Sequence, residues 1–453
     1  MNSVLFLSIF SALAVFYFFI GLYASKNIKT NSDYFLASRD LGLWPVTFTL
    51  IATQLGGGML LGTAERAYSI GYWGILYTIG MSLGFLMLGL GFAAKLRSLN
   101  VATTAELFET KYHSPTLKKV ASLLSVATMC GILIAQVIAS KTLLTALNIH
   151  NEYIFLMFWA FVIIYTMIGG LKAVVFTDVA QVWVIILVFG AIFLYCLFTE
   201  PASFFTFNSL VENQKSFLME GASIPSSSLL ATIMLPALFS LIEQDLAQRF
   251  FAARTQKIAA LSAILASVFL LAFSFIPIYF GMKAQLMHLP IEAGASPLIP
   301  VLEILTSQLV LIFAVCGIIA AITSTADSLL CAVSSNIAQD FNFSFLGIKD
   351  QLKISQMVTL ITGIVVLGAS YVISHNIIGI LISSYEISVS CLLIPLLYSY
   401  FGDNLKKNAA IGGIVAGLIG FILFRFYPIF IPKEIAAIGL SFIGYRLGNK
   451  IRA

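Results

Sequence analysis

Long apolar runs, separated by short polar segments, recur from one end of the 453-residue chain to the other. Each run has about 20 residues, the length with which an α-helix crosses the hydrocarbon core of a bilayer. The pattern predicts an all-α, polytopic membrane protein with a single membrane domain over residues 1–453. About 13 transmembrane helices are expected, at residues 3–24, 43–67, 71–95, 117–147, 153–169, 176–198, 227–248, 258–283, 301–335, 354–374, 376–400, 408–426 and 432–448.

The composition agrees with a membrane location and excludes an ordinary soluble domain. Hydrophobic residues make up 60% of the chain and charged residues only 10%, whereas soluble domains carry about 25% charged residues. The lipid bilayer is therefore the expected partner of most of the surface. The net charge of +5 does not call for a nucleic acid, because basic residues of membrane proteins gather in cytoplasmic loops. The sequence indicates no obligate protein partner, and it has no HExxH motif or Ser/His/Asp grouping that would indicate an enzyme.

The distribution of Lys and Arg predicts how the chain is oriented in the membrane. If the N-terminus lies outside and each span reverses the direction, the cytoplasmic loops hold about three times as many Lys and Arg residues as the outer loops. A missed span would mix the two sets, so the bias also supports the span count. We expect an outer N-terminus and a cytoplasmic C-terminus. The short loops and termini favour a bacterial inner membrane. The first run lacks a preceding basic segment, so we expect a retained helix rather than a cleaved signal.

A dense group of polar residues lies within the predicted span 301–335. Ala321, Ser324, Thr325 and Ser328 share one face of a helix there, because they follow the i, i+3, i+4, i+7 spacing. Hydroxyl and carbonyl oxygens on one face suit a hard cation such as Na⁺, and Asp327 adds a carboxylate where a charge is costly unless it has a partner. The alternative is that the hydroxyls bond to their own helix or hold neighbouring helices together.

Two predicted spans contain signals for an interrupted helix. In span 43–67, Gly56–Gly58 are three consecutive glycines, which disfavour a continuous helix. A break at bilayer depth frees carbonyls that can bind a cation, and the next helical segment can direct its N-terminus at an anionic group. The alternative is a notch of small residues against which a neighbouring helix packs. In span 227–248, Pro236 predicts a second break.

Charged and amide side chains near the end of the seventh predicted span have several interpretations. Arg249 is expected at the cytoplasmic interface, where Glu243 and Asp245 can pair with it or with Arg254. The alternative for these two carboxylates is a binding role. Gln244 is the candidate in this segment for contact with a solute.

Two further carboxylates lie inside predicted spans. Asp178, near the start of span 176–198, either favours the helix N-terminus through its charge or binds an ion just inside the membrane. Glu386, in span 376–400, either pairs across the bundle or lines a vestibule. The sequence leaves both alternatives open.

The two predicted breaks occupy equivalent positions in two halves of the chain. When the first span is left out, the next ten can be numbered core spans 1 to 10, with the glycine break in core span 1 and Pro236 in core span 6. Broken helices at equivalent positions are typical of an inverted repeat with a binding site at the midplane. We therefore expect two inverted five-helix repeats, residues 43–198 and 227–400. The leading helix 3–24 precedes them, and two accessory helices in 408–448 follow.

Several short motifs, in this order, give the chain a resemblance to a known family. They are Asp33–Ala37, Gly169–Val174 with Thr177, Asp178 and Gln181, then Gln248–Arg249, and Ser324–Ser328. Over about residues 33–400 the chain resembles the sodium:solute symporter family, which includes carriers of glucose, proline, pantothenate and sialic acid. The resemblance implies a fold similar to that of the leucine-transporter group. It also implies a symporter that moves a small-molecule substrate with Na⁺ as the coupling ion.

The resemblance also implies roles for individual residues. The main sodium site, between core spans 1 and 8, maps to Ala52, Leu55, Ala321, Ser324 and Thr325. Some members have a second sodium site, which maps to Asp178, Ser324, Asp327 and Ser328. Known two-sodium members can carry Ser where this chain has Asp327, so an acid there either strengthens that site or carries a proton. Candidate substrate residues are Gln54, Gly56, Gly57, Gly58, Met59, Phe239, Ser240 and Gln244.

An amino acid or another small carboxylate is the expected solute. Sugar-transporting members have polar side chains after the core span 1 break and an Asn with aromatic residues in core span 6. This chain has Gly58 and Met59 in the first place, and Pro236, Phe239 and Ser240 in the second. The alternatives are a proton-coupled or sodium-independent carrier of the same fold and, more remotely, a membrane solute sensor.

Overall fold

The computed structural model describes residues 3–26, 28–147, 149–199, 226–292, 295–343, 350–373, 377–427 and 431–451. Within these residues the chain is almost entirely helical, with one isolated strand-like bridge between Leu41 and Ala253. In chain order the elements are α1 (Ser3–Ser25), α2 (Asn31–Leu36), η1 (Ala37–Arg39), α3 (Leu43–Gln54), η2 (Gly58–Gly62), α4 (Thr63–Ile70), η3 (Gly71–Ile75), α5 (Leu76–Met87), η4 (Leu88–Phe92), α6 (Ala93–Ser98), α7 (Glu106–Thr110), α8 (Pro115–Ala146), α9 (Glu152–Thr199), α11 (Ser226–Ser240), α12 (Gln244–Ala252), α13 (Gln256–Phe273), α14 (Phe275–Leu286), α15 (Leu298–Leu305), α16 (Gln308–Asp340), α17 (Gln351–Ala369), α18 (Ile377–Phe401), α19 (Lys407–Phe426) and α20 (Lys433–Lys450).

Ten helices in the described part of the chain are long and apolar enough to cross a bilayer. In this count α9 is one helix, and so is each of the stretches Gly58–Ser98, Leu230–Ala252 and Gln256–Leu286. α9 has 48 residues, but Gly170 divides it into two helical segments of about 27 and 43 Å at 1.5 Å per residue. Each is close to or longer than the roughly 30 Å of a hydrocarbon core. We expected two spans here, 153–169 and 176–198, with a loop between them. The structure has no such loop within this described stretch: the two segments meet at Gly170, whose backbone is not helical, and the chain folds back there, since Phe158 and Gln181 from the two segments line one small cavity.

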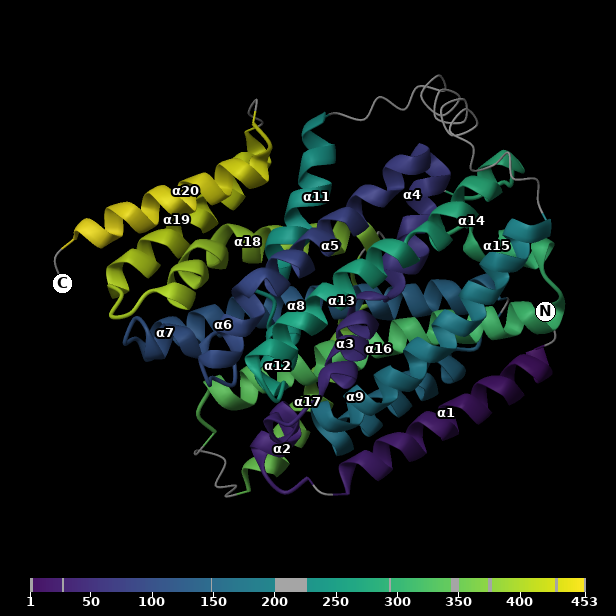
Figure 1. Ribbon diagram of the computed structural model, residues 1–453, viewed down its shortest axis with the longest axis horizontal. Helices are drawn as coiled ribbons and strands as arrows, with labels where there is room; N and C mark the ends of the chain where they lie inside the picture. Colours follow the sequence, from purple (N-terminus) through teal and green to yellow (C-terminus); the bar gives the residue numbers. More distant parts are fainter. Residues whose placement is uncertain are drawn as a thin grey trace.

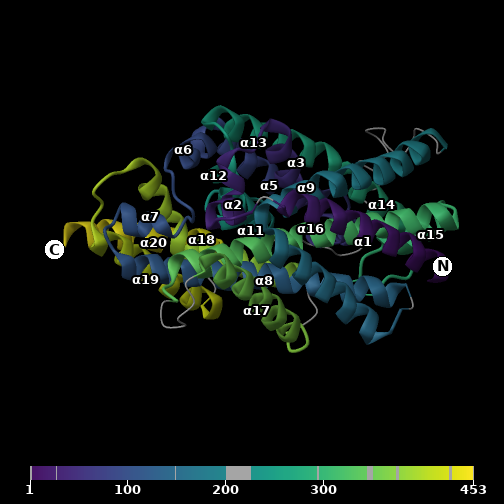
Figure 2. The same cartoon turned by 90° about the horizontal axis from the view of Figure 1, so that it is seen from below.

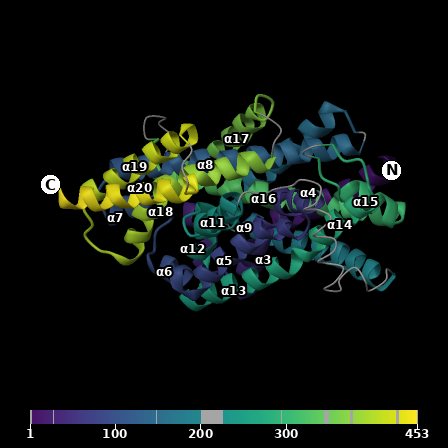
Figure 3. The same cartoon turned by 90° about the horizontal axis from the view of Figure 1, so that it is seen from above.

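α16 forms the centre of the bundle. It packs against α9, α8, α17 and α3, and it lies in the middle of the molecule in Figure 1, Figure 2 and Figure 3. The buried share of its apolar window is 83%, against 17% for α1, so α16 is an interior helix and α1 faces outward along most of its length. α1 runs beside α9, while α19 and α20 pair at the opposite end, next to α18 (Figure 1). Large apolar side chains such as Phe19, Leu90 and Val372 are exposed on the bundle, as lipid contact requires.

Both expected interruptions are present, but the second is not at Pro236. Core span 1 stops at the end of α3, Gln54, and resumes at Gly58, so the predicted break at the glycines is confirmed. Core span 6 consists of α11 and α12, separated by residues 241–243. Pro236 lies inside α11, so the predicted position of this break was wrong. A proline removes one hydrogen bond and bends a helix without having to end it. The chain leaves the helical conformation at Glu243, with φ −66° and ψ 127°.

The short helix α2, between α1 and α3, packs on the interruption in α9. The Tyr34 phenol donates to the carbonyl of Met167 at 2.9 Å and to that of Thr166 at 3.3 Å. Gly170 has φ +50°, and a Cβ atom there would lie 2.4 Å from the carbonyl oxygen of Tyr34. One contact therefore explains why a tyrosine and a glycine are needed at these two distant positions.

The replacement Gly170→Ala should destabilise the protein, because the side chain would meet both an unfavourable φ and the Tyr34 carbonyl. The expected loss in the free energy of unfolding is about 1–3 kcal/mol, measured as a lower midpoint of thermal unfolding. Gly190→Ala, also in α9, is the matched control, because its Cβ would meet nothing within 4 Å. That variant should be neutral or slightly stabilising. Equal midpoints for the two variants would contradict the strain assigned to Gly170.

Candidate cation and solute site

Two hydroxyls of α16 bond to the last carbonyls of α3, where core span 1 is broken. Ser324 donates to the carbonyl of Ala52 at 3.1 Å and to that of Ala321 at 3.0 Å. Thr325 donates to the carbonyls of Thr53 at 3.0 Å, Ala321 at 3.2 Å and Ala52 at 3.4 Å. Leu55, the remaining residue expected at the main sodium site, is fully buried and directly follows α3. Carbonyl and hydroxyl oxygens that converge in this way are suitable ligands for a hard cation.

A second polar network lies next to this crossing and is centred on Arg249 of α12. The guanidinium donates to the Thr49 hydroxyl at 3.0 Å, to the Asp245 carbonyl at 2.7 Å and to the Ser328 hydroxyl. One of its nitrogens lies 3.7 Å from Asp178, and both side chains of this ion pair are fully buried.

The expectation that Arg249 marks the cytoplasmic interface was therefore wrong. After the break in core span 6, α12 packs against α3 and α16 and carries Arg249 into the bundle. The expected partners were wrong as well, since Arg254 pairs with Asp40 at 2.6 Å. The partner of Arg249 is Asp178, which comes from α9.

Asp178 and Asp327 each have one carboxylate oxygen that accepts a hydrogen bond from the described residues and one that does not. Thr49 donates to Asp178 Oδ2 at 2.5 Å, and Tyr165 donates to Asp327 Oδ2. In the described part of the chain, Oδ1 of Asp178 and Oδ1 of Asp327 are buried and accept no hydrogen bond. A buried acceptor without a donor is costly. These two atoms, with one arginine for two carboxylates, fit a site that can take a further cation.

Thr53 connects the two regions. Its carbonyl accepts from Thr325 at 3.0 Å, and its hydroxyl donates to Ser328 at 3.2 Å. The residues expected at the main and the second sodium site are thus neighbours in one continuous network.

Neighbouring helices pack closely against the three glycines of the break. A Cβ atom on Gly56 would lie 2.5 Å from Thr325 Oγ1, one on Gly57 2.9 Å from Ala139, and one on Gly58 2.8 Å from Leu381. The Gly57 N–H donates to Gln136 at 2.9 Å. The packing-notch interpretation therefore accounts for these glycines, while the carbonyls just before the break are the ones that α16 uses.

The expected solute residues of core span 6 lie in different surroundings. Phe239 stacks on Tyr385 with ring centroids 4.5 Å apart, and Ser240 donates to the carbonyl of Pro236 in its own helix. Across from them, the side chain of Gln54 contacts Glu243, and Met59 is buried just after the glycines.

Gln244 points away from the glycine break. Its side chain accepts from the Thr104 N–H at 2.7 Å and donates to the Ala102 carbonyl at 3.3 Å. The geometry therefore gives it a role in holding the segment that precedes α7. We had expected Gln244 to contact the solute, but it is the neighbouring Glu243 that lies at the break in core span 6.

Sequence reasoning missed Thr49 and Tyr165, and it left Tyr77 unmentioned. Thr49 donates to Asp178, and Tyr165 donates to Asp327. The hydroxyls of Tyr77 and Tyr385 form a hydrogen bond with each other. A carboxylate inside a span signals that a donor must lie nearby. It does not indicate which distant helix supplies that donor.

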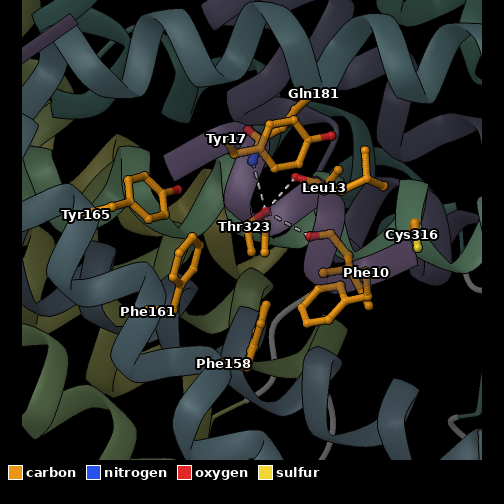
Figure 4. A pocket seen from close by; sticks show the side chains of 12 residues that line it. Phe10, Leu13, Tyr17, Phe158, Phe161, Tyr165, Gln181, Cys316 and Thr323 are labelled. Atoms are coloured by element: carbon orange, nitrogen blue, oxygen red, sulfur yellow. Dashed lines mark hydrogen bonds between the residues drawn. The ribbon is translucent and has the colours of Figure 1, made fainter. Parts of the chain in front are cut away.

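A small cavity lies behind the network, between α1, α9 and α16 (Figure 4). Its volume of about 30 Å³ is room for about two water molecules. Aromatic rings of Phe10, Phe158 and Phe161 line it together with Gln181, which donates to Thr323 at 3.1 Å. Tyr165 lines the cavity and bonds to Asp327, so the cavity borders the second network directly.

The bundle has two helices broken near its centre, and oxygens of carbonyls, hydroxyls and carboxylates gather at their crossing with α16. This is the architecture of an ion-coupled secondary transporter. The sequence model of the sodium:solute symporter family matches residues 34–417. The chain therefore belongs to the sodium:solute symporter family, as the motifs indicated. Sodium-coupled solute transport across a membrane, with Na⁺ as the coupling ion, follows from this membership.

Solved structures of transporters share the fold. One is a Na⁺-coupled sialic acid symporter, in a substrate-bound outward-open state that reveals a novel Na⁺ site. It matches with TM-score 0.79 and 18% identity over 99% of this chain and 98% of the other. Mhp1, a nucleobase-cation-symport-1 family transporter closed around bromovinylhydantoin, matches with TM-score 0.55 and 14% identity over 93% and 96%. Inward-facing Mhp1 matches with TM-score 0.52 and 12% identity over 89% and 90%. At these identities the likeness concerns the fold alone.

The replacement Arg249→Gln should destabilise the protein strongly, because it leaves Asp178 buried without its ion-pair partner. Loss of one member of a buried pair costs about 3–5 kcal/mol. Arg254→Gln is the matched control, since Arg254 and Asp40 form an exposed pair on the same stretch of chain, where about 0–1 kcal/mol is expected. Both losses are measured as shifts in the thermal unfolding midpoint. A similar small shift for both variants would contradict the structural role of Arg249.

Proposed function

We propose that this protein imports a small organic solute together with Na⁺ by alternating access around a midplane site. The observation that carries the proposal is the crossing of α3 and α16, where Ser324 and Thr325 bond to the carbonyls that precede the break. A Na⁺ bound by these oxygens would hold the two helices together and favour the outward-open, substrate-ready shape. Opening to the cytoplasm would then separate the helices and release both ion and solute.

The proposed topology is 13 transmembrane helices with two inverted five-helix repeats, 43–198 and 227–400. Support comes from α9, which is long enough for two spans and is interrupted at Gly170. Further support comes from the broken core spans 1 and 6, which stand five spans apart. The distribution of Lys and Arg supports an outer N-terminus and a cytoplasmic C-terminus, and the short loops favour a bacterial inner membrane.

The proposed main sodium site consists of Ala52, Leu55, Ala321, Ser324 and Thr325. A second site at Asp178, Ser324, Asp327 and Ser328 is supported by the carboxylate oxygens of Asp178 and Asp327 that lack partners. At a membrane potential of 100 mV each inward Na⁺ contributes about 2.3 kcal/mol, which supports a solute gradient of tens-fold for one ion. Two ions would support the square of that gradient.

The proposed solute is an amino acid or another small carboxylate rather than a sugar. It would bind between Gln54, the glycines at 56–58, Met59 and the Phe239–Ser240 end of α11. The contact of Gln54 with Glu243 supports this location, because it joins the two broken helices. The same fold could instead be proton-coupled or independent of sodium, or it could act as a membrane solute sensor, and the experiments below separate these functions.

Replacing external Na⁺ with choline should abolish solute accumulation in proteoliposomes that contain the purified protein. Without the ion, the oxygens of α3 and α16 lack the charge that stabilises the solute-binding shape. The measurement is uptake of radiolabelled amino acid mixtures under an imposed inward gradient, with protein-free liposomes as the control. Uptake that is unchanged in choline would contradict sodium coupling, and uptake that follows an imposed pH gradient instead would identify the proton-coupled carrier. Sodium-dependent binding without any uptake would identify a sensor.

The double replacement Ser324→Ala and Thr325→Ala should weaken sodium binding about tenfold or more, since it removes two oxygen ligands. The measurement is the Na⁺ concentration that gives half of the maximal thermal stabilisation. Ser334→Ala is the matched control, because that buried serine lies on the same helix and donates only to Leu330 of its own backbone. Unchanged sodium affinity in the double variant would show that α16 does not carry the coupling ion.

A further inference from the structure

The break in core span 6 presents one ionisable side chain to the centre of the bundle. Residues 241–243 separate α11 from α12, and Glu243 follows the apolar Leu241 and Ile242. Glu243 is buried, and so is Asp245, which lies in the first turn of α12. The carboxyl groups of Glu243 and Asp245 lie next to each other. A pair of carboxyl groups in the interior is costly unless a positive group or a set of donors balances it.

The surroundings of Glu243 come from both broken helices, from α5 and from α18. Its carboxyl contacts the side chain of Gln54, which ends α3. The phenols of Tyr77 and Tyr385 lie within electrostatic range of it, and these two hydroxyls bond to each other at 3.0 Å. The ring of Tyr385 stacks on Phe239 with centroids 4.5 Å apart. Glu243 therefore lies beside a pair of aromatic rings, at the place where the two breaks face each other.

In the described part of the chain two arginines lie near this position, and neither forms an ion pair with Glu243 or Asp245. Arg66 is in electrostatic range of Tyr77 and donates to Thr232 at 3.4 Å. Arg249 is in electrostatic range of both carboxyl groups, but its nitrogens bond to Thr49, Ser328 and the Asp245 backbone carbonyl and face Asp178. Within the described part of the chain, neither Glu243 nor Asp245 forms an ion pair, and Asp245 Oδ2 is buried without a hydrogen-bond donor.

The buried ionisable side chains around the two breaks also include more acidic than basic groups. Four carboxyl side chains are buried around the two breaks, and Arg249 is the one fully buried basic side chain in the described chain. When ionised, the four carboxylates exceed the arginine by three charges. Asp178 and Asp327 belong to the proposed second sodium site. Two bound Na⁺ ions would reduce the excess from three negative charges to one, and this charge would remain at Glu243 and Asp245. The four residues are Asp178, Glu243, Asp245 and Asp327.

We propose that the transported solute carries a positively charged amine, and that Glu243 binds this group beside the stacked rings of Phe239 and Tyr385. An ammonium group is attracted both by a carboxylate and by the faces of aromatic rings. Gln54 supplies a hydrogen-bonding amide from the other broken helix. The solute class is thus an amino acid or another amine-bearing metabolite, and a carboxylate without an amine is excluded. This inference rests on the proposed function, because it names the chemistry of the same solute site.

The first test is a thermal-shift comparison of the purified full chain with matched compounds, with and without Na⁺. Each set contains an amino acid, its decarboxylated amine and its deaminated acid: alanine with ethylamine and propionate, leucine with isopentylamine and 4-methylpentanoate, proline with pyrrolidine and pentanoate. Glycine betaine and glucose complete the panel. Ligands that bind the native state raise the unfolding midpoint by mass action. We expect sodium-dependent shifts only from compounds with a charged amine.

The second test uses Glu243→Gln, which keeps the size of the side chain and removes its charge. Affinity for the compound with the largest shift should fall about tenfold to a hundredfold, as for the loss of a hydrogen bond to a charged group. Glu243→Asp should recover part of that affinity. Glu386→Gln is the matched control, because Glu386 is a buried carboxylate that pairs with Lys433 at 2.7 Å. It should leave ligand affinity unchanged.

The outcomes separate this inference from the proposed function. Sodium alone should stabilise the wild type and Glu243→Gln equally, which also shows that the variant is folded. If sodium stabilises the protein but no amine-bearing compound binds, or if deaminated acids bind as well as amino acids, the inference is overturned and the sodium site stands. Unchanged amine affinity in Glu243→Gln also overturns it. If sodium has no effect on the wild type, the proposed function itself fails.

Discussion

A helix that ends inside a bilayer leaves its last carbonyls without partners, and hydrocarbon offers no water to satisfy them. α3 ends in this way at Gln54, in the middle of the bundle. The hydroxyls of Ser324 and Thr325 donate to the carbonyls of Ala52 and Thr53, so a neighbouring helix offsets the cost of the break. A sodium ion can satisfy the same carbonyls. The packing of the bundle around α16 thus depends on carbonyl oxygens that can be satisfied in two ways, by the hydroxyls of α16 or by a cation from solution.

The features that the sequence predicted well are those that depend on local spacing and on the cost of polar groups in lipid. Ser324 and Thr325 lie one helical turn from Ala321, so they had to share a face, and three glycines in a row could not continue a helix. The family motifs then paired these two segments correctly. The helical character of the chain followed from composition and from the length of the apolar runs.

The features that could not be predicted depend on contacts between distant segments. Arg249 looked like an interface residue because it follows an apolar run, but its place is set by Asp178 on another helix. The position of the break in core span 6 was wrong because a proline can bend a helix without ending it. Gln244 and Glu243 are adjacent in sequence and face different neighbours. Which of them faces the centre depends on the backbone angles at the break, which no residue pattern specifies.

Thr53 offers its carbonyl to Thr325 and its hydroxyl to Ser328. An ion at the proposed main site would compete with Thr325 for the Thr53 carbonyl, and an ion at the proposed second site would compete with Thr53 for Ser328. Binding free energies that are coupled through a shared group are reciprocal, so each cation would alter the affinity for the other by the same factor. In the proposed two-ion carrier, the steepness of the response to sodium would then depend on this single side chain.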